Sequence, residues 1–111
     1  MSVPNLNRKL VLEEAVRSAD SMGGVVETWT TLGEIWASID ALGGAERLIG
    51  GIMIPVTKFK IITRSAPFGA ASRPRAEQRF VEAGRVFDIL AVAEMDGAAQ
   101  YLEIWAEEGR P

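Results

Sequence analysis

Short runs in which apolar and polar residues alternate recur along the chain, and they predict β-strands. In residues 8–14, Leu10 and Leu12 fall on one side of an extended chain, whereas Lys9 and Glu13 fall on the other. A period of two is the pattern of a strand with one buried face. The same reasoning predicts strands over residues 8–14, 25–30, 34–42, 56–64, 79–81, 86–93 and 100–107.

Tight turns are expected between several of these strands. Asp20 and the Gly23-Gly24 pair precede residues 25–30, and both residue types suit the positive φ angles that hairpins require. We therefore expect residues 25–30 to pair with the first strand. Residues 82–85 and 95–98 are predicted to form two further turns, and residues 65–77, with two prolines and no period, a long loop.

The strand pattern breaks at residues 43–53. Four apolar residues recur there at helical spacing, namely Leu48, Ile49, Ile52 and Met53. This spacing predicts a short helix that Pro55 ends. The Gly50-Gly51 pair inside it would cost a helix about 1 kcal/mol per glycine relative to alanine, so a mobile apolar segment is the alternative.

The sequence contains no βαβ rhythm, no internal repeat and no linker that would divide it. The expected fold is therefore all-β and mainly antiparallel. It is one domain over residues 1–111, a small β-barrel or sandwich with one short helix and a long loop.

The composition of the 111 residues narrows the chemistry that the chain can carry. It contains no cysteine and no histidine, so thiol nucleophiles, thiolate metal sites and the commonest general base are missing. We therefore expect no catalytic residues, no metal site and no cofactor. The chain also has no apolar run near the roughly 18 residues of a membrane span, and its N-terminus lacks the features of a secretory signal. These features predict a protein of the cytoplasm, or of a particle assembled there.

Charge is unevenly distributed along the chain, whose formal net charge is −3. Residues 58–85 contain seven Lys or Arg and two acids, whereas residues 86–108 contain six acids and no base. A basic strand and loop can bind DNA or an acidic partner. It can equally be a solvated surface, and lysines on an edge strand also protect against aggregation.

Three tryptophans lie in predicted strands: Trp29, Trp36 and Trp105. Bases of single-stranded nucleic acids can stack on such residues, but tryptophans in strands more often anchor a core or an interface. Two other segments, residues 43–51 and 65–77, would be costly to order in an isolated monomer. Segments of this kind often become ordered when a neighbour docks, which favours a protein that acts within an assembly.

The order of these elements resembles that of the phage head–tail joining proteins, the small head-closure or stopper proteins of long-tailed phages. The resemblance covers nearly the whole chain and rests on an ordered set of segments: residues 6–12, the hairpin from Asp20 to Trp29, and residues 35–46, 58–64 and 79–89. Residues 65–78 are longer, and residues 48–54 more apolar, than is usual in that family.

The resemblance implies a structural virion protein with a small β-barrel fold, assembled in the bacterial cytoplasm as part of a phage, a prophage or a gene transfer agent. It implies a homo-oligomeric ring, of six copies rather than twelve, between the portal and adaptor proteins and the tail-terminator and tail proteins. The ring would retain packaged double-stranded DNA in its channel and dock the tail, with no membrane partner and no enzymatic step.

Within this picture, three groups of residues receive roles. The ring contact, inter-ring contact or channel loop would use Gly43, Gly44, Leu48, Ile49, Gly50, Gly51, Ile52 and Met53. The basic residues that would meet DNA or a neighbouring subunit are Arg64, Arg73, Arg75 and Arg79, and the basic and acidic stretches would pair across a head-to-tail ring contact. The core or interface anchors would be Trp29, Trp36, Phe59, Phe87, Ile89 and Trp105. The alternative is a small β-barrel that binds nucleic acid as a monomer.

Overall fold

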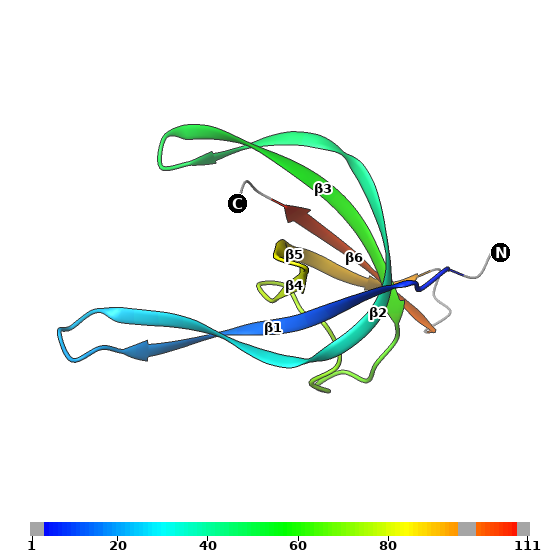
Figure 1. Cartoon of the computed structure of the whole chain (residues 1–111), viewed down its shortest axis with the longest axis horizontal. Coiled ribbons are helices and arrows are strands. Elements are labelled where there is room, and N and C mark those ends of the chain that lie inside the picture. The colour runs from blue at the N-terminus through cyan, green and yellow to red at the C-terminus, as the bar shows by residue number, and fades with distance from the viewer. Residues whose placement is uncertain (1–3, 96–99, 109–111) are drawn as a thin grey trace.

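Antiparallel strands dominate the computed structural model, which describes residues 4–95 and 100–108 (Figure 1). The strands are β1 (Arg8–Ala19), β2 (Val25–Ile49), β3 (Ile52–Arg64), β4 (Arg79–Glu82), β5 (Arg85–Glu94) and β6 (Tyr101–Glu108). They close into a barrel in the order β1-β2-β3-β6-β5-β4, because β4 pairs with β1 through Leu12 and Phe80. The expected all-β, antiparallel barrel is confirmed.

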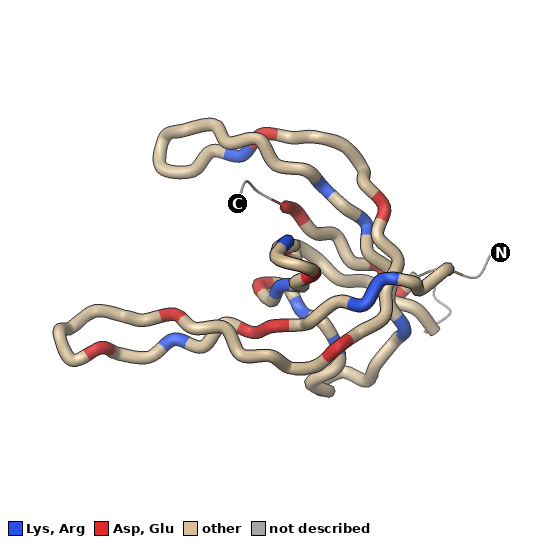
Figure 2. The backbone as a smooth tube through the Cα atoms, viewed as in Figure 1, with Lys and Arg blue, Asp and Glu red and all other residues tan. Residues whose placement is uncertain are grey.

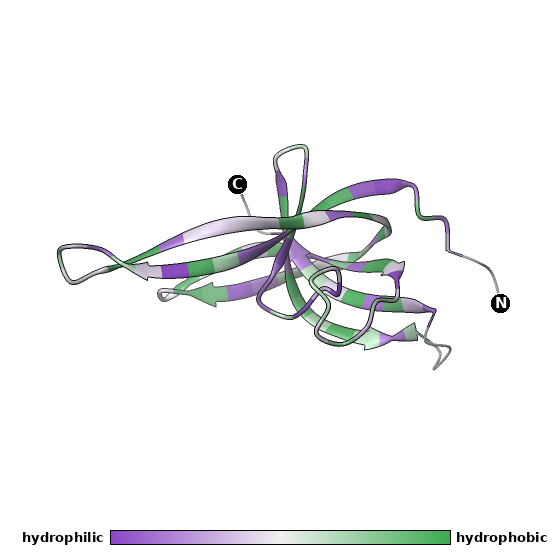
Figure 3. Ribbon diagram, turned by 90° about the horizontal axis from the view of Figure 1, so that it is seen from below, coloured by the Kyte–Doolittle hydropathy of each residue, from purple (hydrophilic) through white to green (hydrophobic). Residues whose placement is uncertain are grey.

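Alternating side chains from all six strands fill the interior of the barrel, and Figure 3 shows this alternation as bands of opposite hydropathy along the strands. Phe59 and Phe87 pack edge to face there, with ring centroids 5.2 Å apart. The buried cluster consists of Leu10, Leu12, Ala37, Phe59, Ile61, Phe80, Phe87, Ile89, Leu102, Ile104 and Ala106. A barrel this small is filled by its own side chains, so a single chain encloses a core rather than a channel.

β2 is one strand of 25 residues, whereas the sequence pattern predicted two strands, over residues 25–30 and 34–42. The register between β1 and β2 shifts between Leu12 and Glu13, opposite Gly33 and Thr31. Such a β-bulge bends a strand without ending it. The glycine therefore marks a bend, and β1 likewise continues to Ala19 instead of ending near residue 14. The predicted pairing of residues 25–30 with β1 is confirmed.

The predicted short helix over residues 43–53 is wrong, because this segment forms the far end of the β2–β3 hairpin. Gly50 and Gly51 form its two-residue turn with φ angles of 57° and 81°, the positive pair that this kind of hairpin turn requires. Leu48 pairs with Met53 and Ile49 with Ile52 across the turn. The apparent helical spacing is thus a consequence of cross-strand pairing around two glycines.

Pro55 does not end this segment, as the sequence suggested, but lies inside β3. It pairs with Glu46 of β2, while β6 reaches β3 only as far as Thr57. The outer edge of β3 is therefore unpaired at Pro55, and an unpaired edge is where a strand tolerates proline. The alternative expectation of a mobile apolar segment stays a prediction.

The long loop between β3 and β4 is confirmed, and hydrogen bonds hold it in place. Ser65 N donates to Gln100 O at 2.9 Å, and the Arg73 guanidinium donates to Ala66 O at 2.8 Å. The predicted turn between β4 and β5 is also confirmed, with Ala83 and Gly84 at positive φ. The predicted turn over residues 95–98 lies largely outside the described residues.

Candidate functional site

Two long two-stranded arms project from the barrel (Figure 1). The first arm is residues 14–30, where β1 and β2 pair only with each other because β4 reaches only Glu13. The second arm is residues 44–56, where β2 and β3 pair only with each other because β6 pairs with β3 no further than Thr57. An isolated two-stranded ribbon has no third strand or second layer to stabilise it. Both arms therefore offer surfaces that the chain itself does not cover.

The tip of the second arm is apolar on both faces. Leu48 and Met53 face each other on one side of the ribbon, and Ile49 and Ile52 on the other. All four are exposed, and Leu48 is 66% exposed. No charged residue lies beyond Arg47 on this arm, as the uncoloured tip in Figure 2 shows. The structure thus brings together the residues that sequence reasoning assigned to a contact segment, although on a hairpin instead of a helix.

The tip of the first arm is a second apolar surface, which sequence reasoning treated only as a turn. Val16, Val25 and Val26 are exposed there, and Met22 is 91% exposed. Asp20 fixes the turn, because its Oδ1 accepts hydrogen bonds from Met22 N at 2.8 Å and Gly24 N at 2.7 Å. Exposed valines next to an otherwise polar turn are the signal that could have revealed this surface.

A groove of about 530 Å³ separates the second arm from the barrel wall. Its lining includes Ile49, Ile52 and Met53 of the arm together with Arg47, Asp88 and Glu107. Arg47 donates a hydrogen bond to Glu107, which is only 4% exposed. The pKa of Asp88 is raised above 3.8, first because protein atoms around its carboxyl displace water and second because Glu107 lies opposite it.

Three of the four predicted basic residues already have partners within the chain. Arg75 pairs with Glu14, and Arg79 donates to Glu13 at 2.7 Å while its guanidinium lies 3.9 Å from the Trp29 ring centroid. Arg73 bonds to the loop backbone and stacks on Phe68, also at 3.9 Å. For Arg64, which is exposed, the described residues provide no ion pair. Arg75 and Arg79 thus tie the β3–β4 loop and β4 to the base of the first arm.

The basic and acidic stretches also meet within the chain. Because β3 and β6 are neighbours, Lys60 Nζ lies 3.5 Å from Glu103 Oε1. Arg85 at the start of β5 donates two bonds of 2.9 Å to Glu108. Figure 2 shows the two kinds of charge side by side along the barrel. The charge pattern that suggested a contact between subunits therefore already serves pairing between neighbouring strands.

The six predicted anchors divide by burial. Phe59, Phe87 and Ile89 lie in the core. Trp29 and Trp105 are half-buried, and Trp36 is 55% exposed with Lys9 Nζ 5.9 Å from its ring centroid. Phe59, Phe87 and Ile89 are therefore buried in the barrel, whereas Trp36 faces outward.

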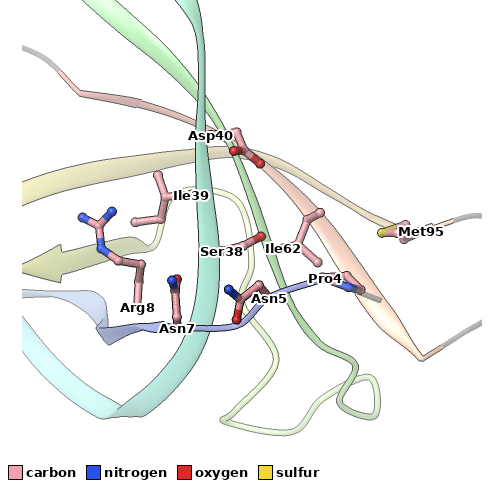
Figure 4. Close-up of a pocket in the computed structure, with 9 residues that line it drawn as sticks. All are labelled: Pro4, Asn5, Asn7, Arg8, Ser38, Ile39, Asp40, Ile62 and Met95. Carbon is pink, nitrogen blue, oxygen red and sulfur yellow. The ribbon is translucent and has the colours of Figure 1, made fainter. Parts of the chain in front are cut away.

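A polar hollow of about 520 Å³ lies between the N-terminal segment and strands β2 and β3 (Figure 4). Among the nine residues that line it, only Arg8 and Asp40 are charged, and Arg8 donates to Glu82 at 2.7 Å. Across residues 4–95 and 100–108 there is no group of three His, Cys, Asp or Glu able to hold a metal ion. The described part of the chain has no helix long and apolar enough to span a membrane.

A comparison with protein families identifies a match over residues 1–109 to the model of the phage head completion protein family. The chain belongs to this family. Membership confirms the predicted relationship to head–tail proteins and the predicted location in a virion. The family is one of structural virion proteins, and the chain is expected to assemble with other proteins of the particle.

Solved structures of similar proteins agree with membership of the head completion family. A chain from the virion of a native gene transfer agent particle is 50% identical, with a TM-score of 0.85 and coverage of 97% of this chain and 98% of that chain. Protein SF1141 from Shigella flexneri 2a, solved in solution, is 25% identical, with a TM-score of 0.67 and coverage of 97% and 96%. No curated protein matches the chain.

Proposed function

We propose that this head completion protein forms a head-closure ring between the portal and adaptor proteins and the tail. In this role the ring retains the packaged DNA and offers the surface on which the tail docks. The observation that carries the proposal is the second arm, a two-stranded ribbon whose tip is apolar on both faces and exposed. Isolated exposed clusters of this kind mark protein contacts.

The arms suit a ring because they extend well beyond the barrel, which gives the chain extents of 53 × 32 × 25 Å. A ring of identical subunits uses two different surfaces of each copy in a heterologous contact. The two arm tips supply two such surfaces on one chain. The work of this protein is then mechanical, since arms or loops that converge on the ring axis would narrow the channel for DNA.

The alternative of a monomeric nucleic-acid-binding barrel finds less support. Binding of this type needs free cationic side chains along a groove. Lys60, Arg75, Arg79 and Arg85 are instead engaged with carboxylates of the same chain. These pairs would have to break before the residues could neutralise phosphates.

Deletion of the gene, followed by electron microscopy of the particles, tests the proposal. We expect filled or leaking heads without tails, and restoration by the parent gene. The double variant Ile49→Ser/Ile52→Ser should fold, because only exposed arm residues change. It should fail to restore tailed particles, because the apolar tip of the second arm is lost. Leu90→Ser, at an exposed apolar residue of the barrel, is the matched control and should restore them.

Normal tailed particles from the deletion strain would overturn the proposal. In that case, salt-dependent binding of single-stranded DNA with quenching of tryptophan fluorescence would support the nucleic-acid alternative. Restoration by the Ile49→Ser/Ile52→Ser variant would contradict the contact role of the second arm, on which the proposal rests.

A further inference from the structure

The root of the second arm is a β-bulge at a glycine. The register between β2 and β3 shifts between Ala41 and Gly43, opposite Phe59 and Lys58. Gly43 has a φ of 140°, a conformation that residues with a side chain rarely adopt, and no atom lies within 4 Å of where a Cβ would be. A bulge interrupts the ladder locally. The arm can therefore bend here with fewer broken hydrogen bonds than elsewhere along the hairpin.

Beyond this root, side chains hold the arm to the barrel wall. The pairing of β3 with β6 ends at Thr57 and Glu108, so no ladder joins residues 44–56 to the barrel. Arg47 reaches from the arm to Glu107 of β6, and Lys58 Nζ at the root lies 4.0 Å from Glu107 Oε2. Arg47 is thus the charged residue of the arm that contacts the barrel wall in the described part of the chain.

The carboxylate that receives Arg47 is in an unusual setting for a charged group. Glu107 is only 4% exposed, and Asp88 lies directly opposite it on β5. A buried carboxylate beside another acid is costly unless cations pair with it. The wall therefore favours the position of the arm in which Arg47 covers Glu107.

The arm does not otherwise pack tightly against the wall. The groove of about 530 Å³ between them is open, with Ile49, Ile52 and Ile54 along the arm side. Closure of the arm would bury these residues, and swinging outward would expose them further. The arm therefore has two discrete positions, closed against the wall or swung outward. An ion pair at one end of the open groove, near a glycine bulge, can hold the arm in one of them.

We propose that the second arm is a hinged element that bends at Gly43 and is latched to the barrel by the Arg47–Glu107 pair. A neighbouring protein that presents a carboxylate to Arg47 would compete with Glu107 and release the arm. This latch is a property of the single chain, so it holds or fails independently of the proposed head-closure ring.

The experiment measures the position of the arm in the isolated full-length chain. Because the chain has no cysteine, Leu48→Cys and Ala91→Cys provide two unique sites, both exposed, for nitroxide labels on the arm and on β5. Double electron–electron resonance then gives the distribution of distances between them. In the doubly labelled parent we expect one narrow distribution. Addition of Arg47→Gln should shift its mean by more than about 3 Å, the rise of one residue along a strand, or widen it by that amount.

Arg85→Gln is the matched control, since Arg85 pairs with Glu108, the neighbour of Glu107, and does not belong to the arm. It should leave the distribution unchanged. The double variant Arg47→Gln/Glu107→Gln also removes the carboxylate, which Arg47→Gln leaves with Lys58 as its cation, so it should recover stability while the arm stays displaced. If Arg47→Gln alone fails to fold, the distance distribution of this double variant tests the latch in its place. A parental distribution in the folded variants that lack Arg47, or an equal shift in Arg85→Gln, would overturn the latch.

Discussion

Substitution of Gly50 or Gly51 by alanine distinguishes the hairpin from a helix, because the two structures predict effects of opposite sign. In a helix, alanine in place of glycine stabilises by about 1 kcal/mol. In the hairpin, both glycines have positive φ angles, of 57° and 81°. An alanine there must adopt a left-handed conformation that costs roughly 1–2 kcal/mol.

The magnitude follows from the surroundings of the two glycines. No atom lies within 4 Å of the Cβ position at either residue, so steric contacts add nothing and the backbone conformation decides. Alanine also reduces the conformational freedom of the unfolded chain, which stabilises the folded state by about 0.4–1 kcal/mol. We therefore expect each alanine variant to lose about 0.8 kcal/mol, the difference between the midpoints of these two effects, and at most about 1.6 kcal/mol.

Two further substitutions serve as controls. Gly50→Asn creates an Asn-Gly turn, which suits positive φ at both positions, so the change should stay within about 0.5 kcal/mol. Gly44→Ala lies on the same arm, where a Cβ would sit 4.0 Å from Val56 O without strain and where φ is not positive. This variant should be at least as stable as the parent.

The assay combines urea unfolding with amide hydrogen exchange of the arm. Exchange is needed because the arm can open locally without global unfolding. A loss of 1 kcal/mol should speed exchange of residues 44–56 about fivefold. Equal or greater protection in Gly50→Ala and Gly51→Ala, together with a loss in Gly50→Asn, would refute the hairpin turn.

Two more predictions concern the barrel. Because the pKa of Asp88 is raised in the folded state, the charged carboxyl opposes folding, so stability should fall as the pH rises through 3.8 and above. Asp88→Asn should therefore stabilise the protein at pH 7, by less than about 1 kcal/mol since the side chain is partly exposed. The variant should lose this advantage near pH 3. Equal urea midpoints for parent and variant at pH 7 would contradict the prediction. Phe87→Ala, which empties part of the core around Phe59, should cost about 3–5 kcal/mol of unfolding free energy, whereas Trp36→Ala at an exposed site should cost far less. Similar losses in both would show that Trp36 is more buried in solution than in the structure.

Much of the fold could be read from local pattern. The alternation around Phe59 and Ile61 in residues 56–64 predicted a strand with one buried face, and both side chains lie in the core. The turn at residues 82–85 and the loop after β3 were likewise predictable, because glycine, proline and the loss of a period are local signals. The exposure of the apolar residues in residues 43–53 agrees with the contact role expected from the sequence, which stays a prediction.

Other features could not be read from the sequence. The pattern around Gly50-Gly51 fits both a helix and a hairpin. Ile49 and Ile52 are three positions apart and Ile49 and Met53 four, which is helical spacing, yet Ile49 and Ile52 also pair across the two-residue turn. The bulge at Gly33 looks like the end of a strand until β1 is seen to shift its register opposite it. The first arm was missed as a surface, because no local pattern shows that the pairing of β4 with β1 ends at Glu13. Residues 14–30 therefore have no third strand beside them.

The sequence by itself determined the inward faces of residues 8–14 and 56–64, the turns at residues 20–24 and 82–85, and the absence of cysteine and histidine chemistry. These properties depend on neighbours along the chain. The tertiary structure decided which charges meet: β3 lies beside β6, so Lys60 finds Glu103, and the second arm folds back so that Arg47 covers Glu107. Pairing between strands far apart in the sequence depends on the closure of the barrel, and only that closure separates the residues held in pairs from those left exposed for assembly.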